Sequence, residues 1–227
     1  MSEKIEPFED TTALRNEIIE ACLFLCKIGF CIGTWGNISV RVEKGLLITP
    51  TRVDYDTMTP DDLVLVDWEG KILSEGKLPS SEMQLHRLLL LRRPDMAVVV
   101  HSHSPYASSV AAAGRSIPVC VDDMAQIIGD EVECASYVPG GRHFPLAEAA
   151  CEAIGDISAA VLLMNHGPVV LGRNLHEAVV ASQVLEKSAM MLIFAESIGG
   201  CKSIPEDMVK EERYRYLYKY GRKEDAE

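Results

Sequence analysis

The sequence predicts an α/β protein in which helices cover both faces of one mixed sheet. Short apolar runs typical of strands alternate along the chain with segments whose apolar residues have helical spacing. Short turns join these segments, and no repeat, low-complexity tract or linker separates them. The 227 residues, 48% of them hydrophobic, suit a single domain over residues 1–227 with a sizeable core.

The first half of the chain predicts a helix at residues 11–29, a hairpin at 37–42 and 46–49, and a second hairpin at 63–67 and 71–75. A second helix at 80–93 and a buried strand at 96–100 follow. The first helix has apolar side chains at helical spacing and ends at a glycine. Each hairpin consists of two apolar runs around a turn, EKG or WEG. The second helix has Ser80 or Ser81 as its cap, two arginines in its last turn and a proline beyond. The run MAVVV is β-branched and short, as a buried strand requires.

The second half predicts a helix at residues 105–114, a short helix at 124–129 and a strand at 133–138. A helix at 145–155, a broken strand pair at 159–172 and a long helix at 174–200 follow. The first of these helices has proline in its first turn. The strand pair is interrupted at NHGP, residues 165–168. The last helix begins with Asn174 and Glu177 in capping-box spacing and ends at two glycines.

Charge and cysteine content exclude several classes of partner and compartment. The formal net charge of −12 argues against nucleic acid and anionic membranes, which are bound through clustered Lys and Arg. No run approaches about 18 consecutive apolar residues, and the acidic N-terminus does not resemble a signal peptide. The seven cysteines form no CxxC pair or regular framework, so we expect reduced thiols in a cytoplasmic protein.

Three histidines stand where buried strands end. His101 and His103 follow the strand 96–100, and side chains two residues apart in a strand point the same way. His166 follows the apolar run VLLMN. Three imidazoles with one open position are typical of a catalytic zinc site. The alternative, that each histidine is an ordinary hydrogen-bonded residue, is about as probable from spacing alone.

Three further segments carry groups that suit an anion. GTWGN at 33–37, TPT at 49–51 and PSS at 79–81 supply glycine backbone, hydroxyls and a helix N-terminus. Turns and a helix cap are the simpler explanation of these residues when each segment is taken alone. Glu82, in the first turn of the predicted helix, complements the helix dipole or acts as an acid or base beside a metal. His86 lies one helical turn later and is expected to be a packed or supporting histidine.

Five blocks, GTWGNISVR, LLITPT, PSSEMQLH, VVVHSHSPYASSVAA and LLMNHGPVVLG, together resemble the class II aldolase and adducin family. The resemblance covers about residues 12–200 and leaves 201–227 as a C-terminal tail. It implies a three-layer α/β/α sandwich whose central sheet is mixed and largely antiparallel. It also implies a homotetramer with active sites at subunit interfaces.

The resemblance implies a role for each matching residue. His101, His103 and His166 are the zinc ligands, with one Zn²⁺ per subunit and Mn²⁺ or Co²⁺ as alternatives. Glu82 is the catalytic acid/base, and it also binds the metal when no substrate is present. Tyr220 matches a C-terminal tyrosine that reaches an active site in some of the aldolases. The residues that match the substrate phosphate site are Gly36, Asn37, Thr51, Ser80 and Ser81.

Three residues, Arg52, Asp122 and Trp35, depart from the family pattern. Arg52 stands where the sugar-phosphate aldolases usually have glycine, and its guanidinium suits a phosphate or a carboxylate. We therefore also assign Arg52 to substrate binding.

The expected function is a zinc-dependent aldolase, a lyase that acts on a small ketose or phosphoketose. Glu82 suits this role if burial raises its pKa toward neutrality. The alternatives are a metal-dependent decarboxylase of a small hydroxy or oxo acid, a zinc hydrolase and a metal-free, adducin-like structural module.

Overall fold

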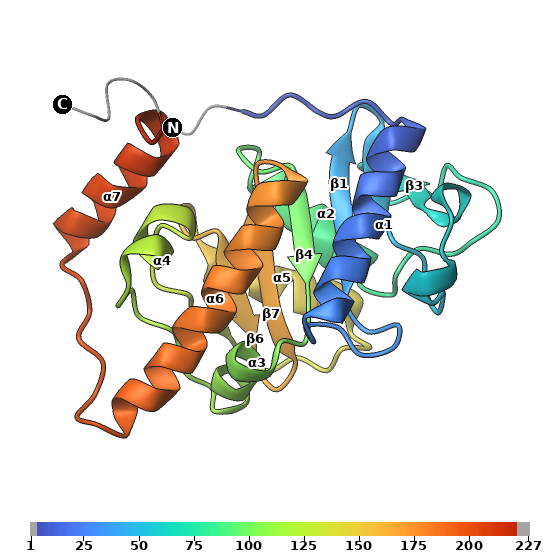
Figure 1. The fold of residues 1–227 in the computed structure, drawn as a ribbon. Helices are drawn as coiled ribbons and strands as arrows, with labels where there is room; N and C mark the ends of the chain where they lie inside the picture. The colour runs from blue at the N-terminus through green and yellow to red at the C-terminus, as the bar shows by residue number, and fades with distance from the viewer. Residues whose placement is uncertain (1–3, 222–227) are drawn as a thin grey trace.

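The computed structural model describes residues 4–221, which form a layered α/β fold (Figure 1). The strands are β1 (Asn37–Val42), β2 (Gly45–Ile48), β3 (Val64–Val66), β4 (Val98–His101), β5 (Cys134–Ala135), β6 (Ala160–Leu163) and β7 (Gly167–Gly172). The α-helices are α1 (Thr12–Lys27), α2 (Met83–Arg92), α3 (Pro105–Ala112), α4 (Asp122–Ile127), α5 (His143–Ile154), α6 (Leu175–Glu196) and α7 (Glu206–Tyr218). Two short 3-10 helices, Tyr55–Thr57 and Pro60–Asp62, lie between β2 and β3.

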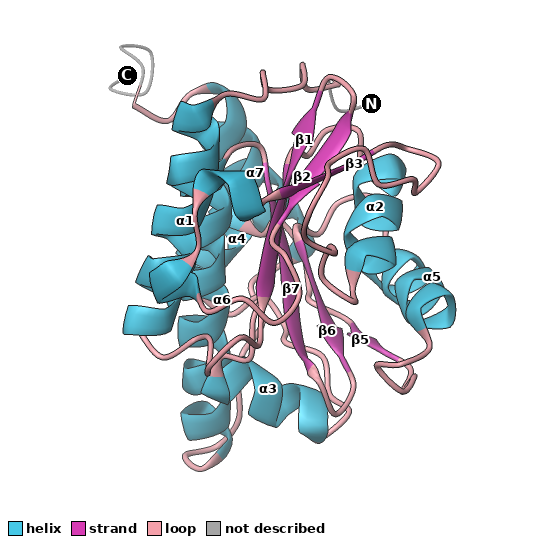
Figure 2. Cartoon of the chain, turned by 90° about the vertical axis from the view of Figure 1, so that its right-hand side faces the viewer, coloured by secondary structure: helices cyan, strands magenta, loops and turns pink. Residues whose placement is uncertain are grey.

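The seven strands form one sheet in the order β3-β2-β1-β4-β7-β6-β5. Every neighbouring pair is antiparallel except β5 and β6, which are parallel. Helices α2 and α5 cover one face of the sheet, and α1, α4 and α6 lie on the other (Figure 2). The expected mixed, largely antiparallel sheet between two helical layers is therefore confirmed.

The central strands are buried on both faces because their alternate side chains enter different cores. In β4, Val99 packs in the core under α2 and α5, whereas Val98 and Val100 pack under α1. In β1, Ile38 and Val40 point toward α1. The polar residues of β1 alternate with these apolar ones, so they lie on the α2 side of the sheet.

Two predicted strands are wrong in extent. Residues 71–75 do not form a strand: a single bridge joins Val66 to Ile72. The pairing stops because the Ser74 hydroxyl, not a backbone carbonyl, accepts the Leu65 N–H at 2.7 Å. The strand predicted at 133–138 is reduced to the two residues of β5, at the edge of the sheet.

Two helices also differ from expectation. Helix α2 begins at Met83 rather than at residue 80, because the Ser80 hydroxyl accepts the Glu82 N–H and Glu82 occupies the cap position. Helix α7 lies in the segment that was expected to be only a tail. Its start carries a signal that the prediction did not use, namely Pro205 followed by two acidic residues.

Helix α6 is long and apolar enough, by length and composition alone, to cross a membrane. It packs against β7, α3 and α4, and 44% of its most apolar window is buried inside the protein. A central helix of a folded core has the same properties, so this feature gives little support to a membrane location.

A buried carboxylate joins α6 to α3, and it supports a prediction on stability. The oxygens of Glu186 accept the backbone N–H groups of Tyr106 and Ala107, each at 2.8 Å, in the first turn of α3. Glu186→Gln replaces one acceptor by a donor, so we expect the free energy of unfolding to fall by about 1–3 kcal/mol. Urea unfolding measures this loss. The matched variant Glu196→Gln, at an exposed ion pair of α6, is expected to lose about 0.5 kcal/mol or less. Equal losses in the two variants would contradict the capping role.

Candidate active site

The three predicted ligands meet at one end of the sheet. His101 is the last residue of β4, and it lies opposite Val169 of the antiparallel strand β7. His166 belongs to the turn between β6 and β7, so this strand pairing brings it beside β4. The turn approaches closely because residue 167 is glycine: a Cβ there would lie 2.5 Å from the Ser102 carbonyl oxygen. Tight packing of the turn thus positions the third histidine.

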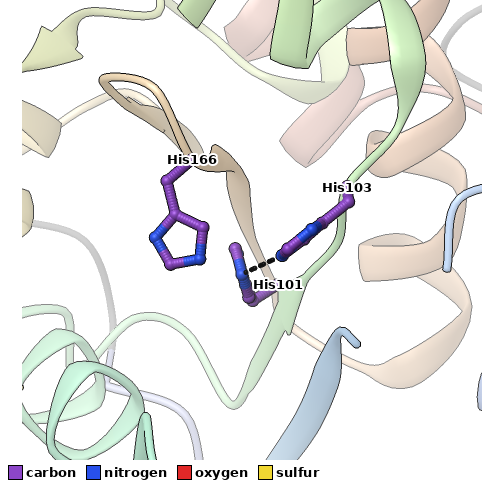
Figure 3. A group of neighbouring side chains, drawn as sticks. All are labelled: His101, His103 and His166. Atoms are coloured by element: carbon purple, nitrogen blue, oxygen red, sulfur yellow. Dashed lines mark hydrogen bonds between the residues drawn. The ribbon is translucent and has the colours of Figure 1, made fainter. Parts of the chain in front are cut away.

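The imidazole rings face a common space (Figure 3). One ligand nitrogen from each of His101, His103 and His166 lies within 4.8 Å of the other two. The Nε2 atoms of His101 and His103 are 3.1 Å apart. His101 donates its Nδ1–H to the Pro168 carbonyl, so in the neutral ring Nε2 is the unprotonated nitrogen and can bind a metal. This second bond is typical of metal-ligating histidines. The cluster can therefore bind a metal ion.

Glu82 lies beside these histidines. Its Oε1 is 3.3 Å from Nε2 of His166, and its Oε2 is 3.5 Å from Nε2 of His101. The side-chain amide of Asn37 donates to Oε2 at 2.8 Å. Glu82 occupies the cap position of α2, but its side chain makes no capping hydrogen bond and lies against the histidines instead. The carboxylate is thus a fourth group at the same point.

The pKa of Glu82 differs from the expectation. Burial raises it, but the nearby imidazoles of His101 and His166 and the bond from Asn37 outweigh burial and lower the pKa to about 2. The expected rise toward neutrality is therefore wrong, because the sequence did not show how close the histidines lie. Burial also lowers the pKa of His103 to about 4. At neutral pH the site consequently holds an ionised carboxylate, which is the form of a base, next to a neutral imidazole.

A cavity of about 440 Å³ opens beside the cluster. Its lining includes all six residues expected to bind substrate: Gly36, Asn37, Thr51, Arg52, Ser80 and Ser81. Glu82, His103 and His166 also line it, whereas His101 is completely buried behind them. The segments TPT and PSS meet because the Ser80 N–H donates to the Thr49 carbonyl at 3.0 Å. The structure thus brings the proposed anion-binding residues and the histidines to one cavity.

The loop that carries Gly36 requires glycine at that position. Its φ is +104°, and an added Cβ would lie 2.7 Å from the sulfur of Cys31. Two other residues of the cavity lining, Gly140 and Trp35, were not assigned to the site from the sequence. Gly140, in the PGG run before α5, lines the cavity near His166. Trp35 also lines it, with its ring centroid 5.9 Å from that of His103.

Arg52 lies at the cavity in an unusual backbone conformation. Its φ is +57°, a left-handed value that favours glycine. Within residues 4–221 its guanidinium makes no hydrogen bond or ion pair. An exposed arginine with these properties leaves its donors available to an anion.

Tyr220 does not line the cavity of its own chain. It follows α7, is largely exposed, and its ring lies 6.2 Å from that of Tyr216. Helix α7 packs on α4 and ends near the N-terminal segment (Figure 1). The catalytic role of Tyr220 stays a prediction.

His86 supports a prediction on acid stability. It is completely buried, and burial lowers its pKa from 6.5 to about 3. Below pH 6.5 His86 binds a proton in the unfolded chain but stays neutral in the folded chain. The free energy of unfolding therefore falls as the pH falls from about 6.5 toward 3. We expect His86 to account for about 2–3 kcal/mol of this loss between pH 7 and 4.5. Urea unfolding of the metal-free protein and of His86→Gln at both pH values measures the difference. The same pH dependence in both proteins would contradict the prediction.

Comparisons with known proteins agree with this fold and site. Residues 16–193 match the family described as Class II Aldolase and Adducin N-terminal domain. The L-fuculose phosphate aldolase of Escherichia coli strain K12 is 36% identical over 180 residues, which are 79% of this chain and 82% of that protein. The L-ribulose-5-phosphate 4-epimerase of Salmonella paratyphi C is 30% identical over 92% of this chain and 95% of that protein. A solved L-fuculose 1-phosphate aldolase superposes with a TM-score of 0.86 at 27% identity, covering 92% of this chain and 98% of that one.

The layered sheet, with a histidine cluster and a carboxylate at its end, defines an enzyme of the class II aldolase type. The chain belongs to the class II aldolase and adducin family.

Proposed function

We propose that this enzyme is a zinc-dependent aldolase that cleaves a ketose phosphate into a ketone phosphate and an aldehyde. One observation carries the proposal: a basic carboxylate, three histidines and the groups of an anion site line a single cavity or lie directly behind it. The relatives act on sugar phosphates according to their names, which supports a substrate of this class.

The donor set suits Zn²⁺ well. Neutral imidazole nitrogens are good zinc ligands, and three of them leave one coordination position for substrate. The hydrogen bond from His101 to Pro168 orients its free nitrogen toward the other rings. His101, His103 and His166 would hold the metal, with Glu82 close enough to join them. Mn²⁺ and Co²⁺ suit similar ligands, so zinc is the preferred member of this group.

The residues divide the chemistry between them. A bound divalent cation supplies Lewis-acid polarisation of the ketose carbonyl. When the carbon–carbon bond breaks, its electron pair stays on the carbon next to that carbonyl, and the other fragment leaves as an aldehyde. In cleavage the hydroxyl that becomes the aldehyde oxygen releases a proton, the Glu82 carboxylate takes one up, and its carboxyl form then donates it to this carbon; in condensation both transfers run in reverse. Ser80, Ser81 and Thr51 hold the phosphate away from the reacting atoms.

Arg52 is expected to strengthen phosphate binding. Arg52→Gly removes the guanidinium and relieves the left-handed backbone, so the fold should be kept. A charge-assisted hydrogen bond contributes about 1.5–3 kcal/mol, so we expect KM for the phosphorylated ketose to rise about 10- to 100-fold. The kcat should stay within about threefold, because Arg52 acts on substrate and transition state alike. Steady-state kinetics measure both values. A variant with unchanged KM would show that the phosphate lies elsewhere.

The proposal is tested by a panel of substrates given to the metal-loaded enzyme. We expect L-fuculose 1-phosphate or another ketose 1-phosphate to release dihydroxyacetone phosphate. Epimerisation of L-ribulose 5-phosphate without cleavage would replace the aldolase proposal by an epimerase. Carbon dioxide release from a small hydroxy or oxo acid would favour the decarboxylase alternative. Ester or amide hydrolysis alone would favour the zinc hydrolase.

We further propose a homotetramer in the cytoplasm. Free thiols at all seven cysteines suit a reducing compartment. A site that receives Tyr220 from a second copy requires assembly.

A further inference from the structure

A chain of buried polar groups lies behind Glu82: it begins at Asn37, which also lines the cavity, and continues to His86 and Ser39, which have no catalytic role above. Asn37 and Ser39 are two residues apart in β1, so they point to the same face of the sheet. His86 lies one turn after Glu82 on α2, the helix that covers this face. Its Nε2 contacts Oδ1 of Asn37 at 2.5 Å, and its Nδ1 contacts the Ser39 hydroxyl at 2.7 Å. Both ring nitrogens are therefore occupied inside the core.

The direction of every hydrogen bond in this chain is determined. The side-chain NH₂ group of Asn37 donates to Oε2 of Glu82, so this carboxylate oxygen is the acceptor. Asn37 must then turn its NH₂ group toward Glu82, at 2.8 Å, and its carbonyl oxygen toward His86. That oxygen can only accept, so His86 must donate from Nε2. A neutral imidazole has a single N–H, here at Nε2, so its Nδ1 accepts from the Ser39 hydroxyl.

This order leaves Asn37 one stable orientation. Were its amide reversed, its carbonyl oxygen would face the Glu82 carboxylate, and His86 would have to accept at Nε2 and donate from Nδ1 to the Ser39 hydroxyl. The contact between the carbonyl oxygen and the carboxylate would be repulsive and buried, which is costly. Asn37 also lies directly opposite His101 in the pairing of β1 with β4. The amide therefore holds the carboxylate at a fixed place relative to the metal ligands.

We propose that His86 is a positioning residue: acting through Asn37, it fixes the Glu82 carboxylate in the orientation from which it transfers a proton to or from the substrate. His86 touches neither the cavity nor the three clustered histidines through its ring nitrogens. The inference rests on the proposed function, since it concerns the catalytic use of Glu82.

Two substitutions of His86 separate positioning from packing. His86→Phe fills the space but provides no donor for Asn37, so we expect kcat for cleavage to fall about 10- to 100-fold. The KM should stay within about threefold, because Thr51, Arg52, Ser80 and Ser81 are untouched. His86→Gln places an amide N–H near the former Nε2 and is expected to restore kcat to within about fivefold of the wild type. His176→Phe, at an exposed histidine of α6, is the matched control and should keep full activity.

The outcomes decide between the roles. The inference is overturned if His86→Phe keeps its kcat within threefold, or if His86→Gln is as slow as His86→Phe while both remain folded. Metal content should equal that of the wild type in both variants. A lower metal content would assign His86 to supporting the metal site and would overturn positioning of Glu82.

A spectroscopic measurement tests the geometry without any activity. In ¹⁵N-histidine NMR spectra of the wild type, the ring resonances that disappear in His86→Gln should report a neutral ring with protonated Nε2 and bare Nδ1. A ring protonated at Nδ1 would overturn the hydrogen-bond order, whatever the substrate. If the wild type cleaves no ketose phosphate, the proposed aldolase fails, and the NMR result still decides the orientation of Asn37.

Discussion

Replacement of Glu82 by glutamine is expected to lower kcat for cleavage about 10²- to 10⁴-fold, the range over which a general acid or base contributes. The carboxylate lies 3.3–3.5 Å from two of the three imidazoles, next to the reacting atoms of a substrate in the cavity. An amide of the same shape cannot accept and return a proton. Steady-state kinetics on a ketose 1-phosphate measure the loss, and hydrogen exchange of the ketone phosphate product in deuterated water measures the proton step alone.

The variant should remain folded and keep its metal, because the histidines alone supply three ligands. Glu75→Gln, an exposed residue in the loop before α2, makes the same chemical change away from the cavity and should not alter kcat. Exchange at the wild-type rate in Glu82→Gln would assign the proton transfer to another group.

Replacement of His103 by alanine is expected to remove the metal and to lower kcat by about 10³-fold or more. His103 reaches the cluster from the segment after β4, and its removal leaves two histidines, fewer than the three protein ligands typical of a catalytic zinc site. The loss of metal removes several kcal/mol of charge stabilisation from the transition state. Metal analysis after dialysis, together with kinetics on the same sample, measures both effects.

His103 lines the cavity, so its truncation should disturb the core less than truncation of the fully buried His101. Unfolding by urea checks this point. A His103→Ala protein that retains about one metal ion per chain would show that the metal lies elsewhere.

The histidine cluster illustrates what the sequence can and cannot predict. The two-residue period of a strand predicted that His101 and His103 would end up together, and the apolar run before His166 predicted a second strand end. The two strand ends meet because β4 pairs with β7. That pairing depends on the order of strands in the complete sheet, which local sequence does not determine. The low pKa of Glu82 arises from the same long-range contact, and for this reason local sequence suggested the opposite shift.

The remaining differences have other physical causes. The first strand of the hairpin predicted at residues 63–75 is present as β3, but the second is not, because the Ser74 hydroxyl took the place of a backbone acceptor. Helix α7 is mostly exposed and has little apolar periodicity, so hydrophobic spacing did not reveal it. His86 was expected only to pack or support, because its contacts with Asn37 and Ser39 join segments almost 50 residues apart.

The most direct test of the central claim is the cleavage of a ketose 1-phosphate by metal-free protein as zinc is added in measured amounts. The account predicts that cleavage is absent at the start, rises in proportion to bound zinc and reaches its maximum at one ion per chain, as expected for one histidine cluster. Full cleavage by protein that binds no metal would contradict it.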